Sequence, residues 1–188
     1  MSRAPLAAVL PACLVLVLLP CVAAPDLLAQ SPVSTTADVV YIPTPQRVVD
    51  AMLAAADIGP SDVVYDLGSG DGRIVITAAR EYGARGVGIE IDPTLVARAT
   101  ENAAAAGVSD RVRFITGNFF AADIGEATVV TLYLLQNINE RLRPKLVREL
   151  RPGTRVVSHV FNMGPEWPPD GTQVIEGNPI FFWTISDP

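Results

Sequence analysis

Short apolar runs alternate with helical segments along most of this chain, and that alternation limits the possible folds more than any other feature. Apolar runs with strand character lie at residues 62–67, 86–91, 111–116, 127–134 and 154–161. Helical segments separate most of them, at residues 72–82, 92–107 and 139–150. Strands that alternate with helices pack into a parallel sheet, because each helix carries the chain back to the start of the next strand. The pattern therefore predicts an α/β fold.

The pattern changes near the C-terminus. Residues 172–176 and 180–185 read as two strands separated only by Gly177, Asn178 and Pro179, which leaves no room for a helix and is typical of a hairpin. Together with the five earlier runs, this predicts a mostly parallel seven-stranded sheet with an antiparallel C-terminal hairpin. One more helix is predicted ahead of the sheet, with Thr44 as its N-cap and Pro45 at its first position.

The first 30 residues differ from everything that follows. Arg3 precedes an apolar run over residues 4–25, which is long enough to span a bilayer. The run predicts either a signal peptide, cleaved after Ala29 or near Ala24, or an N-terminal membrane anchor. We therefore expect an exported (periplasmic) or membrane-anchored protein, with residues 31–40 as a linker and residues 41–188 as one domain.

Cysteine placement and net charge exclude several functions for that domain. Both cysteines, Cys13 and Cys21, lie in the N-terminal segment, so the domain has no disulfide, thiolate nucleophile or cysteine zinc site, and we expect no metal centre. The formal net charge of -6 gives no basic surface that would neutralise phosphates, so we expect no nucleic-acid partner.

The string DLGSGDGR at residues 66–73 joins the first strand of the sheet to the helix that follows it. A glycine-rich turn at this place presents backbone N–H groups and a helix N-terminus to a ligand. The dinucleotide fingerprint G-x-G-x-x-G is not met, because Arg73 stands at its sixth position, and no Gly-Lys-Ser/Thr follows as in a P-loop.

Polar residues at successive strand ends indicate the ligand. Asp66 would repel a pyrophosphate and attract a cation such as an α-ammonium group. Glu90, at the end of the second strand, is placed to accept hydrogen bonds from ribose hydroxyls. Asn118 follows the third strand and can reach an adenine edge, while Phe119 and Phe120 can pack on the ring. Ammonium, ribose and adenine together describe S-adenosylmethionine.

The motif D-x-G-x-G-x-G at residues 66–72, with Glu90 and the closing hairpin, resembles the class I S-adenosylmethionine-dependent methyltransferases. A longer set of strings is similar to a narrower group, the membrane-associated protein-lysine methyltransferases that modify the c subunit of ATP synthase and the adenine nucleotide translocase, together with their bacterial relatives. Those strings are YIPTP (41–45), DLGSGDGR (66–73), GIEIDPTLV (88–96), RPKLVREL (143–150), GTRVVSHVF (153–161) and then Trp167-Pro168. The resemblance implies a Rossmann-like fold, S-adenosylmethionine as cofactor, and a lysine of a protein substrate, such as a membrane protein, as acceptor.

Site residues follow from both lines of argument. By resemblance, Asp66, Gly68 and Gly70 cradle the methionine part of the cofactor, and Thr44 lies near its carboxylate. The full set predicted to bind the cofactor is Thr44, Asp66, Gly68, Ser69, Gly70, Asp71, Glu90, Asn118 and Phe119. After the fourth strand, amide-nitrogen methylases carry Asn-Pro-Pro-Tyr, whereas this chain reads YLLQ at residues 133–136. Tyr133 and Gln136 are therefore predicted to orient a lysine acceptor.

Other interpretations stay open at this point. The domain also fits a small-molecule methyltransferase, or an exported protein that binds S-adenosylmethionine without turnover. His159, the single histidine, is either a base or a hydrogen-bonded structural residue, and Trp167 either walls the substrate site or caps the core. We expect a monomer.

Overall fold

The computed structural model describes residues 41–187, which contain seven strands and four helices. The strands are β1 (Val63–Leu67), β2 (Arg85–Glu90), β3 (Val112–Thr116), β4 (Val129–Leu132), β5 (Arg155–His159), β6 (Gly171–Ile175) and β7 (Asn178–Thr184). The helices are α1 (Gln46–Ala55), α2 (Arg73–Tyr82), α3 (Pro93–Ala105) and α4 (Gln136–Glu149).

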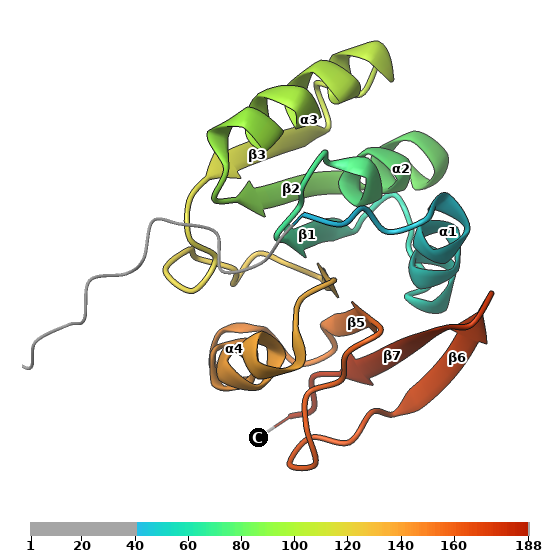
Figure 1. The fold of residues 1–188 in the computed structure, drawn as a ribbon, viewed down its shortest axis with the longest axis vertical. Helices are drawn as coiled ribbons and strands as arrows, with labels where there is room; N and C mark the ends of the chain where they lie inside the picture. Colours follow the sequence, from blue (N-terminus) through green and yellow to red (C-terminus); the bar gives the residue numbers. More distant parts are fainter. Residues whose placement is uncertain (1–40, 188) are drawn as a thin grey trace, which may run out of the picture. The chain divides into compact units, whose positions relative to one another are not determined.

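The strands form a single sheet in the order β3-β2-β1-β4-β5-β7-β6 (Figure 1). Strands β1 to β5 pair in parallel, whereas β7 runs antiparallel to both β5 and β6. The predicted mostly parallel sheet with an antiparallel C-terminal hairpin is confirmed. The order reverses between β1 and β4, and open α/β sheets bind ligands at the carboxyl ends of the strands beside such a reversal.

Apolar side chains bury both faces of the central strands, as the near-continuous apolar runs require. On one face, residues of α1, α2 and α3 pack against alternate strand positions such as Val64 and Val129. On the other face, α4 packs against the intervening positions, among them Tyr65 and Val130. Helices on both faces thus keep the strand ends, and the loops that follow them, in a fixed arrangement.

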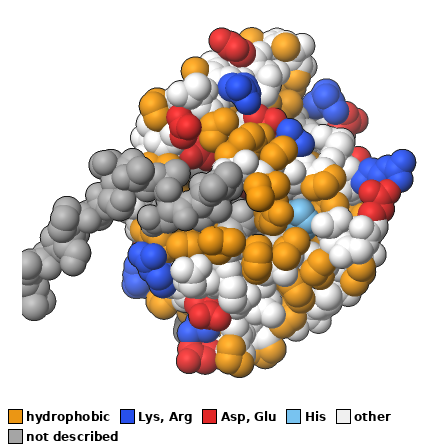
Figure 2. All heavy atoms as spheres, viewed as in Figure 1, with side chains coloured by type: hydrophobic (Ala, Val, Ile, Leu, Met, Phe, Trp, Pro, Cys, Tyr) orange, Lys and Arg blue, Asp and Glu red, His pale blue; other side chains and the backbone are white. Residues whose placement is uncertain are grey.

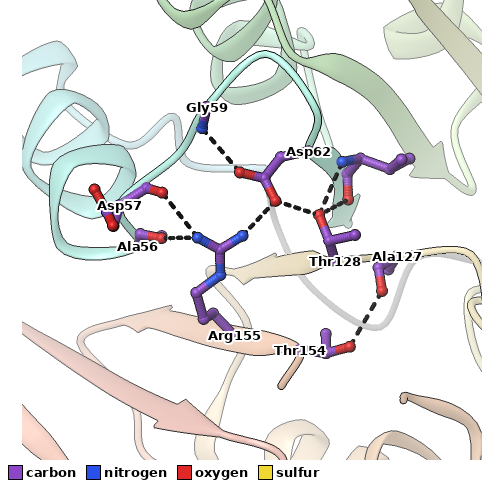
Figure 3. A network of polar contacts seen from close by, with 9 residues as sticks. Ala56, Asp57, Gly59, Asp62, Ala127, Thr128, Thr154 and Arg155 are labelled. Atoms are coloured by element: carbon purple, nitrogen blue, oxygen red, sulfur yellow. Dashed lines mark hydrogen bonds and ion pairs between the residues drawn. The ribbon is translucent and has the colours of Figure 1, made fainter. Parts of the chain in front are cut away.

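A polar network joins the amino-terminal ends of three strands (Figure 3). Arg155 donates to the carbonyl oxygens of Ala56 (2.6 Å) and Asp57 (2.8 Å) and pairs with the carboxylate of Asp62. The same carboxylate accepts a hydrogen bond from the Thr128 hydroxyl (2.6 Å). The network therefore connects the end of α1 to the starts of β1, β4 and β5, at the sheet edge opposite the carboxyl ends.

The predicted N-cap of the first helix is wrong. Pro45 is the N-cap, with extended backbone angles (φ -57°, ψ 142°), and α1 begins at Gln46 with no side-chain cap. Thr44 is buried instead, and its hydroxyl lies 3.4 Å from Nδ1 of His159. Its side chain is engaged in this long-range contact and does not cap the helix.

Two other predicted boundaries need correction. Helix α4 begins at Gln136, not Asn139, and the buried Asn139 amide donates instead to the Phe161 carbonyl oxygen (2.9 Å). The hairpin loop is the two residues Glu176 and Gly177, because Asn178 and Pro179 already belong to β7. Both loop residues have positive φ (51° and 81°), which a type I′ turn requires.

The predicted N-terminal segment and linker lie outside the described residues. Within residues 41–187, no helix combines the length and the apolar composition that crossing a bilayer requires.

Candidate cofactor and acceptor site

A cavity of about 310 Å³ lies at the carboxyl ends of β1 to β5, beside the reversal in strand order. Its walls come from the segment before α1, the glycine loop and the residues that follow each strand. Eight of the nine residues predicted to bind the cofactor line it, namely Thr44, Asp66, Gly68, Ser69, Asp71, Glu90, Asn118 and Phe119. Figure 2 shows hydrophobic side chains spread across the middle of the viewed face. The cavity is thus lined mainly by apolar side chains, with a few polar groups among them.

Asp66 contributes a buried carboxyl group to this cavity. It faces Thr131 across the β1–β4 pair, and the Thr131 hydroxyl donates to Oδ1 of Asp66 (2.9 Å). Burial raises its pKa to about 7; the Thr131 hydrogen bond opposes this shift, and the charges of Glu90 and Asp71 add to it. A cationic ligand group beside Asp66 would favour its ionised form.

The glycine loop is fastened to the end of β2. Glu90 accepts hydrogen bonds from the backbone N–H groups of Gly70 (3.0 Å), Ile91 (2.8 Å) and Asp92 (3.0 Å). Gly70 is not among the lining residues, and the Tyr41 ring packs against it. The hydroxyl of Ser69 is buried and has no hydrogen-bond partner among the described residues. A buried unpaired hydroxyl costs free energy, so a ligand that bonds to Ser69 would restore that loss.

The loop after β3 provides an amide and two aromatic rings. Asn118, Phe119 and Phe120 all line the cavity. The two rings have centroids 4.9 Å apart, and both pack partly against the core. The Asn118 side-chain oxygen accepts a hydrogen bond from the Phe120 N–H (2.8 Å), which turns the chain at this point. The loop therefore offers an apolar wall suited to a planar base.

The two residues predicted to orient the acceptor have different surroundings. Tyr133 lines the cavity, and its ring packs on His159 with centroids 4.1 Å apart. Gln136 is not among the lining residues; its side-chain amide donates to Glu140 (2.9 Å) and Asn162 (3.1 Å).

His159 and Trp167 both lie outside the cavity lining. His159 is 1% exposed, and its Nε2 lies 3.4 Å from the Asn178 side-chain oxygen. Burial lowers the pKa of His159, against the opposing effect of Asn178, so the ring is neutral at neutral pH. Trp167 packs on Trp183 with centroids 5.6 Å apart and accepts its indole hydrogen bond (3.0 Å). The burial of His159 and the ring packing of Trp167 are compatible with the structural alternative for each residue.

Several lining residues were not predicted from the sequence. They are mainly apolar, and include Tyr41, Ile42, Leu134, Leu135, Ile138 and Phe161. Tyr41 and Ile42 belong to the YIPTP string, and Phe161 ends the string GTRVVSHVF. Both strings carry the family resemblance, and this was the signal that could have indicated a place in the site for these residues. No group of three or more potential metal ligands occurs within residues 41–187.

Comparison with known proteins gives consistent results. Residues 66–171 match the model of the family described as the ANTKMT methyltransferase domain. A protein-lysine N-methyltransferase of Saccharolobus islandicus is 50% identical over 139 residues, which cover 73% of this chain and 86% of that protein. The adenine nucleotide translocase lysine N-methyltransferase of Mus musculus is 36% identical over 130 residues, which cover 69% of this chain but only 56% of the mouse protein.

Among solved structures, the chain is similar to one described as an RNA methyltransferase from Salinibacter ruber in complex with S-adenosyl-L-homocysteine. The two are 60% identical with a TM-score of 0.77, over 78% of this chain and 95% of that one. The predicted Rossmann-like methyltransferase fold is thereby confirmed.

Proposed function

Because this chain belongs to the family of ANTKMT methyltransferase domains, we propose that it transfers the methyl group of S-adenosylmethionine to a lysine side chain of a protein. The observation that carries the proposal is the buried Asp66 carboxyl in a cavity at the reversal of strand order, which Ser69 of the glycine loop also lines. These groups fit an α-ammonium and a neighbouring polar group of the cofactor's methionine part. Two relatives named for lysine methylation support the choice of acceptor.

The residues that line the cavity support this proposal, because they match the parts of the cofactor. When bound, S-adenosylmethionine supplies an electrophilic methyl group on a sulfonium sulfur. Asp66 and Ser69 would hold its methionine part, Glu90 its ribose, and the loop after β3 its adenine. Fixing both reactants in line is the main task, and orientation alone can lower a barrier by roughly 7–11 kcal/mol.

The acceptor lysine must be neutral when it attacks. A free lysine has a pKa of about 10.4, and removal from water lowers it. Leu134, Ile138 and Phe161 give the cavity an apolar wall that would desolvate an incoming ammonium. Tyr133 lies in the same wall, and its packing on His159 holds the ring in place. We infer that desolvation, rather than a strong base, prepares the lysine.

The rim of the cavity favours an apolar stretch of protein around that lysine. Ile42 is 62% exposed and Leu135 is 42% exposed, and both line the cavity. Large apolar side chains at the mouth of a pocket mark a surface that binds apolar partners. A lysine next to apolar residues, as in a membrane protein, would match this rim.

An RNA acceptor is the second candidate, because the Salinibacter ruber relative is described as an RNA methyltransferase. The charges at the cavity argue against it. Asp66, Asp71, Glu90 and Asp92 line the cavity, against one lining arginine, Arg73. Nucleic-acid affinity depends on cations that neutralise phosphates, so this cavity offers little that would bind an RNA backbone.

Incubation of the full chain with tritium-labelled S-adenosylmethionine and isolated membranes tests the proposal. We expect label in a protein band that resists lipid extraction and ribonuclease and yields methylated lysine on hydrolysis. Ribonuclease-sensitive label, or label only in lipids or small metabolites, would overturn the lysine assignment. Binding of S-adenosylhomocysteine without any labelled product would identify a non-catalytic binder. The Asp66→Asn variant serves as the negative control.

We also propose that residues 4–25 bring the domain to a membrane or across it, as their composition predicts. Cell fractionation with N-terminal sequencing distinguishes the two forms. An intact N-terminus in the membrane fraction would indicate an anchor, and a new N-terminus after Ala29 or near Ala24 a cleaved signal. An intact chain in the soluble fraction would contradict both.

A further inference from the structure

The segment of residues 41–45 forms one side of the cavity and lies against the glycine loop. Tyr41, Ile42, Pro43 and Thr44 all line the cavity. The Tyr41 ring packs so closely on Gly70 that a Cβ there would come within 2.3 Å of Cε2 of the ring. The segment has no regular secondary structure before α1, so contacts with other parts of the chain must hold it in place.

Arg73 makes a polar contact that joins this segment to the loop, and the Tyr41 side chain also contacts Asp71. Its Nη1 donates to the backbone oxygen of Thr44 (2.9 Å), 29 residues earlier in the chain. Its Nε and Nη2 donate to the two carboxylate oxygens of Asp71, at 2.9 and 2.7 Å. The Asp71 backbone oxygen in turn accepts from the side chain of Asn102 in α3 (2.9 Å). The Arg73 guanidinium thus connects the glycine loop to the segment before α1, and the loop is bonded in turn to Asn102 of α3.

The geometry of these bonds requires an arginine. A guanidinium offers two parallel donors to a carboxylate and further donors in the same plane, whereas a lysine ammonium is a point charge. Burial acts to raise the pKa of Asp71, but the hydrogen bonds and the charge of Arg73 outweigh it and lower that pKa, so the pair stays ionised at neutral pH. Arg73 stands where the dinucleotide fingerprint requires a glycine, and in the structure it bonds to Asp71 and Thr44 instead.

We propose that Arg73 is a positioning residue that clasps residues 41–45 over the cofactor cavity and thereby slows cofactor release. This rests on the proposed function, since the ligand concerned is S-adenosylmethionine. Four consecutive residues of the segment line the cavity, so their position decides how closely the cavity encloses the methionine end of a ligand. Arg73 bonds to this segment and also lines the cavity, so hydrogen exchange of the segment in the ligand-free protein separates positioning from direct contact with the ligand.

The test compares Arg73→Ala and Arg73→Lys with Arg80→Ala in the full chain. Arg80 lies in the same helix, but pairs with Glu81 on the exposed surface, which makes it a matched control. We expect Arg73→Ala to weaken S-adenosylhomocysteine binding and raise the KM for S-adenosylmethionine roughly tenfold or more, the loss expected for hydrogen bonds to a charged group. Its kcat at saturating cofactor should stay within about twofold, Arg73→Lys should be intermediate, and Arg80→Ala should match wild type.

Hydrogen exchange of the ligand-free protein measures directly how firmly residues 41–45 are held in place. Arg73→Ala should speed exchange in the peptide that contains residues 41–45, and Arg80→Ala should not. A folded Arg73→Ala with unchanged exchange and affinity would overturn the proposal. Wild-type protein that fails to bind S-adenosylhomocysteine would refute the proposed function. The exchange data would still show whether Arg73 holds residues 41–45 in place.

Discussion

The buried carboxyl of Asp66 should make cofactor affinity depend on pH. With its pKa raised to about 7 by burial in the ligand-free protein, Asp66 must lose a proton before it can pair with an ammonium group. Affinity for S-adenosylhomocysteine should therefore rise with pH, by up to about tenfold per unit, and level off above about pH 7. Titration calorimetry between about pH 5 and pH 8 measures this profile.

Two variants separate Asp66 from other groups that titrate in this range. Asp66→Asn should bind S-adenosylhomocysteine more weakly, and its affinity should not change with pH. Thr131→Val removes a hydrogen bond that lowers the Asp66 pKa, so the midpoint of the affinity profile should move to higher pH. The folded-state pKa lies above the ordinary 3.8, so the contribution of Asp66 to stability is complete below about pH 4 and is lost as the pH rises through 7. An unchanged pH profile in Asp66→Asn would exclude the carboxyl as the ammonium partner.

Val160 holds a strained backbone conformation directly after β5. Its φ of 67° is rare for a β-branched residue. The N–H of Phe161 donates to the backbone oxygen of His159 (2.8 Å), which closes a tight three-residue turn with Val160 at its centre. Such strain costs of the order of 1–3 kcal/mol, and glycine would relieve it at an entropic cost of roughly 0.5–1 kcal/mol. Val160→Gly should therefore raise the free energy of unfolding by about 1 kcal/mol in urea denaturation. The same change at the exposed helix position Val147 should lower it; a loss at both sites would contradict the assignment of strain.

At the scale of elements, the glycine loop depends on close contact between backbone and ring. Gly70→Ala would place a methyl group 2.3 Å from the Tyr41 ring at a φ of 52°. Gly107→Ala, at a φ of 70° with no atom within 4 Å of the added Cβ, introduces backbone strain without a clash. Both should lose roughly 1 kcal/mol of stability through strain, but only Gly70→Ala should also weaken S-adenosylhomocysteine binding, by roughly tenfold. Equal binding by the two variants would show that the contact with Tyr41 is irrelevant to the cofactor.

Elements with local end signals were predictable from the sequence. Asp92 caps α3 and accepts from the Thr94 N–H (2.8 Å), with Pro93 following it, and Gly83 ends α2 in a left-handed conformation. The start of α4 carries no such signal, since its N-cap is Leu135 and no side chain caps it. Thr44 resembled an N-cap because its long-range contacts are invisible in the local sequence.

The same distinction applies to the site. Asp66 and Glu90 were predictable because carboxyl ends of parallel strands share one edge of a sheet. The bond from Arg73 to Thr44 joins residues far apart in the chain, and no periodicity or spacing encodes such a pair. The apolar lining at Leu134 and Leu135 was missed for a related reason: these residues extend an apolar run that looks like a strand, although β4 ends at Leu132.

At the scale of the whole molecule, the polar network of Arg155 and Asp62 lies at the amino-terminal ends of the strands, and the cavity lies at their carboxyl ends. Burial acts to raise the pKa of Asp62, but hydrogen bonds from Thr128 and Gly59 and the charge of Arg155 outweigh it and lower the pKa below its ordinary 3.8. A lowered folded-state pKa contributes stability that is present above about pH 4 and is lost as the pH falls through the folded-state value. The network in Figure 3 should thus make the fold sensitive to acid.

Arg155→Ala tests this separation. It leaves the Asp62 carboxylate and two carbonyl oxygens without their shared donor. The free energy of unfolding should therefore fall at neutral pH by about 2–4 kcal/mol at most, because water can reach this half-buried site and bond to some of the groups left unpaired. Part of the acid sensitivity should disappear with it, while affinity for S-adenosylhomocysteine should stay unchanged, because the cavity lies at the far edge. Arg47→Ala breaks an ion pair whose side chains are 78% and 50% exposed, and should change stability by less than about 1 kcal/mol. Urea denaturation at neutral and acidic pH, with a binding titration on the same samples, measures both quantities. A folded Arg155→Ala that loses cofactor affinity would show that the two edges are coupled through the strands.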